Sequence, residues 1–101
     1  MRTAESANGI RIRLTDERWV HIVESHNELA GLVFSVLDTV ANPDFIVRGT
    51  RGEKLAVHKL NRKYLVVVYK EREEDGFIIT AFLTSKIKQI RKRGVIWNRE
   101  F

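Results

Sequence analysis

Three histidines are the side chains of this chain best suited to acid–base chemistry near neutral pH. His21 and His26 fall in a segment with helical periodicity, and His58 falls in a run of β-branched residues. On a helix, His26 lies about 20° from Trp19 and so within the apolar stripe, whereas His21 projects to the opposite side. The structural alternative for His26 is a core-edge histidine bonded to a backbone carbonyl, and for His21 a solvated surface position.

The neighbours of His58 depend on the length of the turn that follows it. A turn of even length places His58 with Lys54 and Tyr69, and a turn of odd length places it with Tyr64 and Lys70. Both alternatives put an imidazole among cationic and phenolic groups.

Hydroxyl groups interrupt the last apolar strand of the sequence. Thr80 lies inside FIITAF, and Thr84 and Ser85 follow its end. These hydroxyls could hold a phosphate oxygen. Threonine is also an ordinary strand residue, however, and Thr84 or Ser85 could simply cap the next helical turn.

Positive charge is concentrated in the second half of the chain. The net charge of +5 divides into −3 over residues 1–44 (4 Arg, 7 Asp and Glu) and +8 over residues 45–101 (14 Lys and Arg, 6 Asp and Glu). A one-sided basic surface is typical of nucleic-acid binding, because each neutralised phosphate releases condensed counterions. A merely solvated surface is the alternative. The candidate RNA-binding cations are Lys54, Lys59, Lys70 and the C-terminal run Lys86, Lys88, Arg91, Lys92 and Arg93.

Metal and cofactor chemistry have no support in the residue spacings. The chain has no cysteine, no HExxH or CxxC spacing and no glycine-rich phosphate loop followed by Lys-Ser/Thr. The acidic run from Glu71 to Asp75 is interpreted as a solvated hairpin tip. We therefore expect no metal site and no cofactor.

The pattern of the N-terminal half predicts a strand and two helices. Residues 1–9 are expected to form a disordered tail, and apolar alternation over 10–14 indicates a short strand. Thr15 is a natural N-cap for a helix that starts at about Asp16. Asn27 could cap a second helix, which the helical period extends to Val40 before Pro43 stops it.

The second half switches to strand periodicity. Strands are expected at 45–48, 54–60, 64–70 and 77–83, and their short connections predict an antiparallel meander. A short basic helix ending near Arg93 should follow, after which residues 95–97 return apolar side chains to the core, Trp97 among them. Residues 10–101 are thus expected to form one α+β domain, with two helices packed on a four-stranded sheet.

The location expected from the sequence is the cytoplasm. Absence of cysteine suits a reducing compartment. The N-terminus has no apolar run typical of a signal peptide, and the apolar stretches are shorter than the ~18 residues of a membrane helix.

Several blocks of the sequence together resemble a known group of nucleases. The blocks are RLTDERWVHIVESHNEL, NPDFI, RGEKLAVHKLNRKYLVVVYKEREEDGFIITAFLTSKI and a terminal IW, covering about residues 10–97. Their combination resembles the phage and bacterial nucleases grouped with barnase, EndoU, certain colicins and RelE, called BECR nucleases. A more distant similarity is to BrnT toxins, whose N-terminal signature is absent here.

The resemblance implies metal-independent RNA cleavage, in which the 2′-hydroxyl attacks the adjacent phosphate and leaves a 2′,3′-cyclic end. A base, an acid and a cation near the phosphorane are needed. The resemblance places the main catalytic roles on His26, Arg51 and Thr80. It also includes His21, Thr84 and Ser85 in the site. Two departures are Asn27, where proline is frequent, and His58, where arginine is more frequent, so His58 either joins the chemistry or replaces a phosphate-binding arginine.

Two functions follow as hypotheses from the sequence. The first is a toxin-like endoribonuclease, and the second is a non-catalytic module of the same fold that binds RNA or ribosomes. The expected partner is RNA. A small acidic antitoxin or immunity protein is a further candidate partner.

Overall fold

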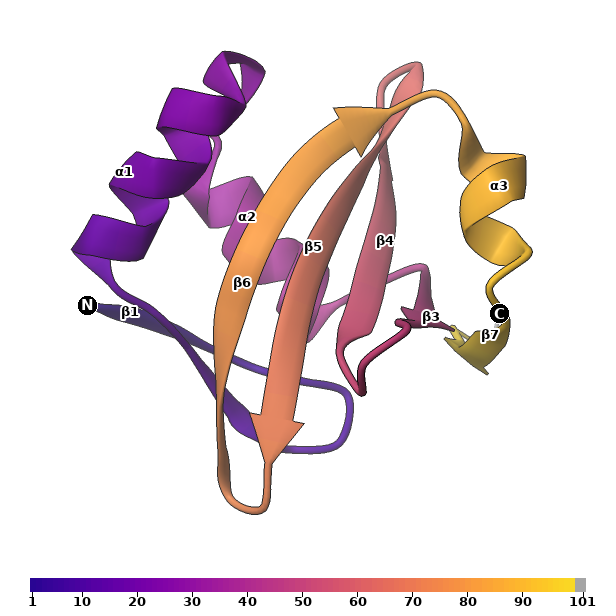
Figure 1. Cartoon of the computed structure of the whole chain (residues 1–101), viewed down its shortest axis with the longest axis horizontal. Helices are drawn as coiled ribbons and strands as arrows, with labels where there is room; N and C mark the ends of the chain where they lie inside the picture. The colour runs from indigo at the N-terminus through magenta and orange to yellow at the C-terminus, as the bar shows by residue number, and fades with distance from the viewer. Residues whose placement is uncertain (100–101) are drawn as a thin grey trace.

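A computed structural model describes residues 1–99 of the chain, which form an α+β fold (Figure 1). Two helices and a short 3₁₀ turn lie toward one side of a single sheet, and a third helix lies toward the other. In chain order the elements are β1 (Arg2–Glu5), β2 (Arg11–Leu14), α1 (Asp16–Ser25), η1 (Asn27–Leu29), α2 (Val33–Ala41), β3 (Phe45–Arg48), β4 (Lys54–Leu60), β5 (Lys63–Arg72), β6 (Asp75–Thr84), α3 (Ile87–Arg91) and β7 (Val95–Asn98).

The sheet is larger than the sequence predicted. Among the described residues it has seven strands in the order β1-β2-β6-β5-β4-β3-β7. Neighbouring strands are antiparallel except β2 and β6, which pair in parallel only from Arg11↔Asp75 to Arg13↔Phe77. The rest of β6 therefore has no strand on its outer side, and helix α1 packs beside it.

The N-terminal segment forms a strand where a disordered tail was expected. Strand β1 pairs with β2 over its whole length, from Arg2↔Leu14 to Glu5↔Arg11. Its sequence, Arg-Thr-Ala-Glu, contains little apolar signal because an edge strand is mostly exposed. The prediction of β2 from its apolar alternation is confirmed, and Ile12 and Leu14 are buried.

The predicted cap of the first helix is confirmed, but the second helix is shorter than predicted. Thr15 caps α1, and its hydroxyl accepts a hydrogen bond from the Arg18 backbone N–H at 3.1 Å, as predicted. The expected second helix from Asn27 was wrong. Instead, η1 is separated from α2 by Gly31, whose φ of +82° is a left-handed conformation that ends helical geometry.

Both faces of the central strands are covered. On the helix side the core includes Ile22, Leu29 and Val36, which pack on the sheet residues Val67 and Ala81. On the other side α3 and β7 cover a second cluster, formed by Phe45, Val47, Leu55, Val57 and Val66. Burial on both faces explains why β3, β4 and β5 contain nearly continuous apolar runs.

The C-terminal elements are less buried than expected. Helix α3 spans five residues, and β7 adds to β3 as the last strand of the sheet. Val95 packs on the second cluster, but Ile96 and Trp97 are 42% and 36% exposed. Trp97 is therefore not a core residue, because an edge strand leaves much of its side-chain surface in solvent. No helix within residues 1–99 is both long and apolar enough to cross a membrane.

Candidate active site

A groove of about 470 Å³ lies between α1 and the outer side of β6. One wall is the side of α1 that carries Arg18, His21 and Ser25, and the other is the middle of β6 at Ile79 and Thr80. The groove exists because β2 pairs with only the first three residues of β6. The complete lining is Thr15, Glu17, Arg18, His21, Ile22, Ser25, Ile79 and Thr80.

His21 lies in this groove together with Thr80, contrary to the expectation that it points away from the site. Its side chain is 65% exposed, and its Nδ1 lies 3.8 Å from Oε1 of Glu24. The apolar stripe indicates which side of a helix is buried, but residues beside that stripe border the neighbouring strand. His21 is adjacent to the buried Ile22 and so lies where α1 meets β6.

His26 lies at the end of α1 and contacts the next part of β6. It is the C-cap residue, with φ −135° and ψ 76°, so the helical angle predicted for it does not apply. Its ring centroid is 6.1 Å from that of Phe82, and its Nδ1 is 3.7 Å from Oε2 of Glu28. The side chain is 35% exposed, which places it at the edge of the core.

His21 lines the groove with Thr80, whereas His26 does not line it; His26 directly follows the lining residue Ser25 and lies beside Phe82, two residues beyond Thr80 on β6. From His21 to Ser25, the last residue of α1, the helix rises by roughly 6 Å, and two residues span roughly 6.7 Å along a strand. Two imidazoles can supply a base and an acid.

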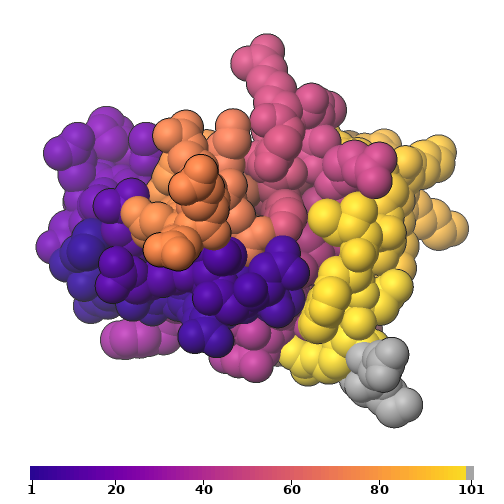
Figure 2. Space-filling model, turned by 90° about the horizontal axis from the view of Figure 1, so that it is seen from below, coloured from indigo at the N-terminus to yellow at the C-terminus, as the bar shows by residue number. Residues whose placement is uncertain are grey.

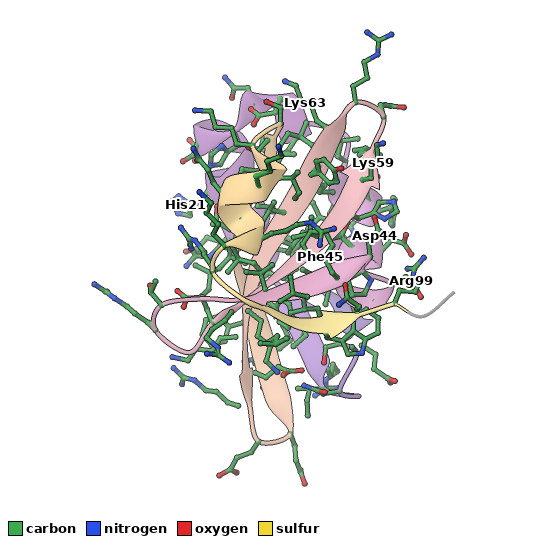
Figure 3. The ribbon with its side chains drawn as sticks, turned by 90° about the vertical axis from the view of Figure 1, so that its right-hand side faces the viewer. His21, Asp44, Phe45, Lys59, Lys63 and Arg99 are labelled. Carbon is green, nitrogen blue, oxygen red and sulfur yellow. The ribbon has the colours of Figure 1, made fainter. Side chains whose placement is uncertain are left out.

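His58 and Arg51 do not line the groove. His58 lies on β4 opposite Leu65, with Lys54 opposite Tyr69, which confirms the even-turn alternative. Its Nδ1 is 3.2 Å from Asp44 Oδ1, and Figure 3 shows Asp44 on the other side of the molecule from His21. Arg51 is exposed in the β3–β4 loop, where its backbone N–H donates to Glu53 Oε1 at 2.6 Å.

The hydroxyls at the end of β6, on Thr84 and Ser85, lie outside the groove. The Thr84 side chain accepts a hydrogen bond from the Lys86 backbone N–H at 3.0 Å, so it caps the turn before α3. Ser85 is exposed beside it. Neither hydroxyl lines the groove that contains Thr80.

The basic C-terminal run is exposed on and around α3. Lys86, Lys88, Lys92 and Arg93 are exposed, as is Lys59 on β4, whereas Lys70 is half-buried. Arg91 is also exposed, but its guanidinium carbon lies 4.0 Å from the Phe45 ring centroid, so a cation–π contact holds it.

Lys54 is not available to RNA, which corrects its assignment from the sequence. It forms an ion pair with Glu71, and the two side chains are only 25% and 11% exposed. Glu71 also accepts hydrogen bonds from Ser6 Oγ and from Asn8 Nδ2, the latter at 3.0 Å. Burial opposes ionisation of Glu71, but these donors outweigh it and hold the pKa of this carboxyl below its ordinary value. Glu71 is thus a structural anchor and not part of a solvated hairpin tip.

The sequence reasoning missed Arg18 and Ser25 as lining residues of the groove. Their spacing offered a signal, since they stand three residues before and four residues after His21 and so share its side of the helix. Within residues 1–99, no three His, Cys, Asp or Glu side chains come together in a way that could hold a metal ion. Comparisons with protein-family models, with curated proteins and with solved structures found no match to the chain.

Proposed function

We propose that this chain is a metal-independent endoribonuclease of the BECR type, and that RNA is cleaved in the groove between α1 and β6. The observation that carries the proposal is the placement of two histidines along one stretch of β6, His21 with Thr80 and His26 with Phe82. Arg18 lines the same groove and supplies a guanidinium cation with several N–H donors.

The proposed reaction is an internal transfer of the phosphate. One imidazole accepts the proton of the 2′-hydroxyl while the 2′-oxygen forms a bond to phosphorus. The bond from phosphorus to the 5′-oxygen breaks, and the other histidine, as an imidazolium, donates its proton to that oxygen. The products are a 2′,3′-cyclic phosphate and a 5′-hydroxyl. The Arg18 guanidinium and the Thr80 hydroxyl can stabilise the charge that develops on the phosphorane oxygens.

The charge distribution gives the RNA a path away from this groove. Helix α3 begins three residues after β6 ends, so its cations continue from the end of the strand that carries Thr80 and Phe82. In Figure 1, α1 and α3 flank the sheet on opposite sides of β6, β5 and β4. Figure 2 shows the C-terminal segment (yellow) at one end of the molecule, with N-terminal residues (indigo) running across the lower face to meet it. An RNA strand that contacts both α1 and α3 therefore has to cross the sheet.

End analysis of cleaved RNA tests the proposed reaction. We expect the purified protein, incubated with RNA in excess EDTA, to produce 2′,3′-cyclic phosphate and 5′-hydroxyl ends, because the two histidines perform the proton transfers. The chemical form of the ends can be identified by mass spectrometry of the RNA fragments. Cleavage that EDTA abolishes and Mg²⁺ restores would contradict the proposal. Saturable RNA binding with no cleavage would favour the binding module instead.

RNA affinity should depend steeply on salt through the α3 region. Replacing Lys88, Lys92 and Arg93 by alanine is expected to reduce the slope of log K against log [salt] by about 2, at roughly 0.7 per lost phosphate contact on single-stranded RNA. Arg91 is left unchanged because of its contact with Phe45. The measurement is fluorescence anisotropy of labelled RNA at several salt concentrations.

A matched variant separates local contacts from net charge. Arg2, Arg11 and Arg72 are exposed on β1, β2 and β5, away from α3, and their replacement removes the same charge. Arg2 and Arg72 lie over Phe34 and Phe77, so thermal unfolding checks that this variant stays folded. We expect this variant to keep most of the slope. Equal slopes for both triple variants would show that α3 does not contact RNA phosphates.

A further inference from the structure

A second pocket, of about 430 Å³, lies on the other side of the molecule from His21. It is formed where the end of α2 meets β4 and β7, and it shares no lining residue with the groove. Figure 3 shows two residues of this region, Asp44 and Arg99, far from His21 in that view. The lining is Ala7, Asp38, Ala41, Asn42, His58, Trp97 and Arg99.

The Asp44 carboxylate holds His58 and Arg99, two side chains that line this pocket. Its Oδ1 lies 3.2 Å from Nδ1 of His58, and its Oδ2 accepts the Lys59 backbone N–H at 2.8 Å. The carboxylate therefore fixes the imidazole through Nδ1, so Nε2 is the nitrogen that can meet a ligand. The His58 side chain is 33% exposed and lines the pocket, with Asp44 behind it.

Arg99 is held beside the same carboxylate. Its Nη1 lies 4.0 Å from Asp44 Oδ1, its Nη2 donates to the Asn42 carbonyl, and its backbone N–H donates to the Asp44 carbonyl at 3.0 Å. A guanidinium has five N–H donors, so several remain for an anion. The side chain is 37% exposed.

The pocket also offers an aromatic surface and a polar edge. Trp97 is 36% exposed although it lies in a strand, and its side chain lines the pocket. Asn42, whose carbonyl is bound by Arg99, donates a hydrogen bond from Nδ2 to Asp38 Oδ1 at 2.9 Å, so a carboxylate and an amide are held together at the end of α2. An indole, a guanidinium, an imidazole and a carboxylate–amide pair meet in one cavity.

We propose that this pocket binds a nucleotide, with the base against Trp97 and the phosphate at Arg99 and His58. Nucleotides are the ligand class that combines a planar π-surface, a phosphate and a hydrogen-bonding edge, and the cavity has a volume within the usual range of ligand sites. The Asp38 carboxylate accepts hydrogen bonds from amino groups, so a base with an exocyclic amine fits better than uracil. The site stands apart from the groove, and its occupancy does not depend on whether the groove cleaves RNA.

Tryptophan fluorescence tests the proposal on the intact chain. A Trp19→Phe background leaves Trp97 as the remaining indole, since the chain has two tryptophans. We expect adenosine 5′-monophosphate to quench Trp97 saturably and to bind more tightly than adenosine, inorganic phosphate or uridine 5′-monophosphate. Replacing Trp97 by alanine, with binding followed by calorimetry, should weaken binding by roughly fivefold or more, because stacking on an aromatic side chain contributes about 1–3 kcal/mol per base.

Three further variants keep the test independent of folding. Arg99→Gln should weaken adenosine 5′-monophosphate but leave adenosine unchanged, whereas Arg11→Gln, an exposed arginine on β2, should change neither. Trp97→Phe should retain most of the affinity. The proposal is overturned if the nucleotide does not bind saturably, or if folded Trp97→Ala and Arg99→Gln both bind it as the unchanged chain does.

The same titration separates two sources of the nucleotide. A trinucleotide that binds more tightly than the mononucleotide, and loses that affinity in Arg99→Gln, indicates one unit of an RNA strand. Equal affinities indicate a free mononucleotide. Both outcomes uphold the site, whereas an acidic tripeptide that displaces the nucleotide at equal concentration would overturn the nucleotide assignment.

Discussion

Replacing His21 by alanine is expected to lower the rate of RNA cleavage by about 10²- to 10⁴-fold, the usual effect of removing a general acid or base. The fold should persist, because the His21 side chain is 65% exposed and exposed substitutions usually change stability by less than about 0.5 kcal/mol. RNA affinity should change little, since we propose that the cations around α3 make most of the phosphate contacts. Single-turnover cleavage, anisotropy and thermal unfolding measure the three quantities separately.

His26→Ala is expected to lower cleavage by at least about 10²-fold as well. The sequence alone ranked His26 above His21, whereas the structure places His21 in the groove with Thr80 and His26 beside Phe82. His26→Ala should also destabilise the fold by about 1 kcal/mol, because its ring packs against Phe82 and is half-buried. Activity must therefore be compared at equal folded fractions.

Val20→Ala is the matched control for both variants. Val20 precedes His21 on α1, is 56% exposed and does not line the groove. Full cleavage by both folded histidine variants would refute the proposed site. A loss that appears only in His58→Ala would instead place the chemistry in the pocket on the other side of the molecule.

The largest expected effect on stability is at Glu71. Replacing it by alanine removes the partner of Lys54 and the acceptor for Ser6 and Asn8 in one step. We expect a loss of about 2–4 kcal/mol in the free energy of unfolding, because a largely buried ammonium is left unpaired. Urea unfolding at pH 7 measures this loss. The control is Glu74→Ala, an exposed acid in the neighbouring hairpin, which should change stability by less than about 0.5 kcal/mol.

The same carboxylate predicts a dependence of stability on pH. The pKa of Glu71 is lowered in the folded state relative to its ordinary value of 4.5. Its contribution is therefore complete above that ordinary value and is lost as pH falls through the lower, folded-state pKa. The stability difference between the unchanged chain and Glu71→Ala should be constant near neutral pH and shrink in acid. A difference that grows as pH falls would show that burial, and not the hydrogen bonds, dominates at this carboxyl.

Local features of the sequence predicted the elements that depend on neighbours along the chain. The start of α1 follows from the Thr15 cap, and the bounds of β3 and β4 follow from apolar runs between turn residues. Caps, turns and periodicity act over a few residues, so the sequence displays them directly. Strands β1 and β7 were not predicted, because an edge strand needs little apolar surface and its partner strand can lie far away in the sequence.

The sequence by itself determined an α+β chain with a basic second half and three candidate histidines. Only the tertiary structure decided which side chains meet. It placed His21 in one groove with Thr80, and it paired Lys54 with Glu71 and His58 with Asp44, residues that are 59, 17 and 14 positions apart in the sequence. Such contacts follow from the parallel pairing of β2 with β6 and from strand register, in which one residue of shift turns every side chain to the other face. Helical angles and residue types contain no information about that register. Candidate site residues could therefore be predicted from the sequence, but which of them lie together could not.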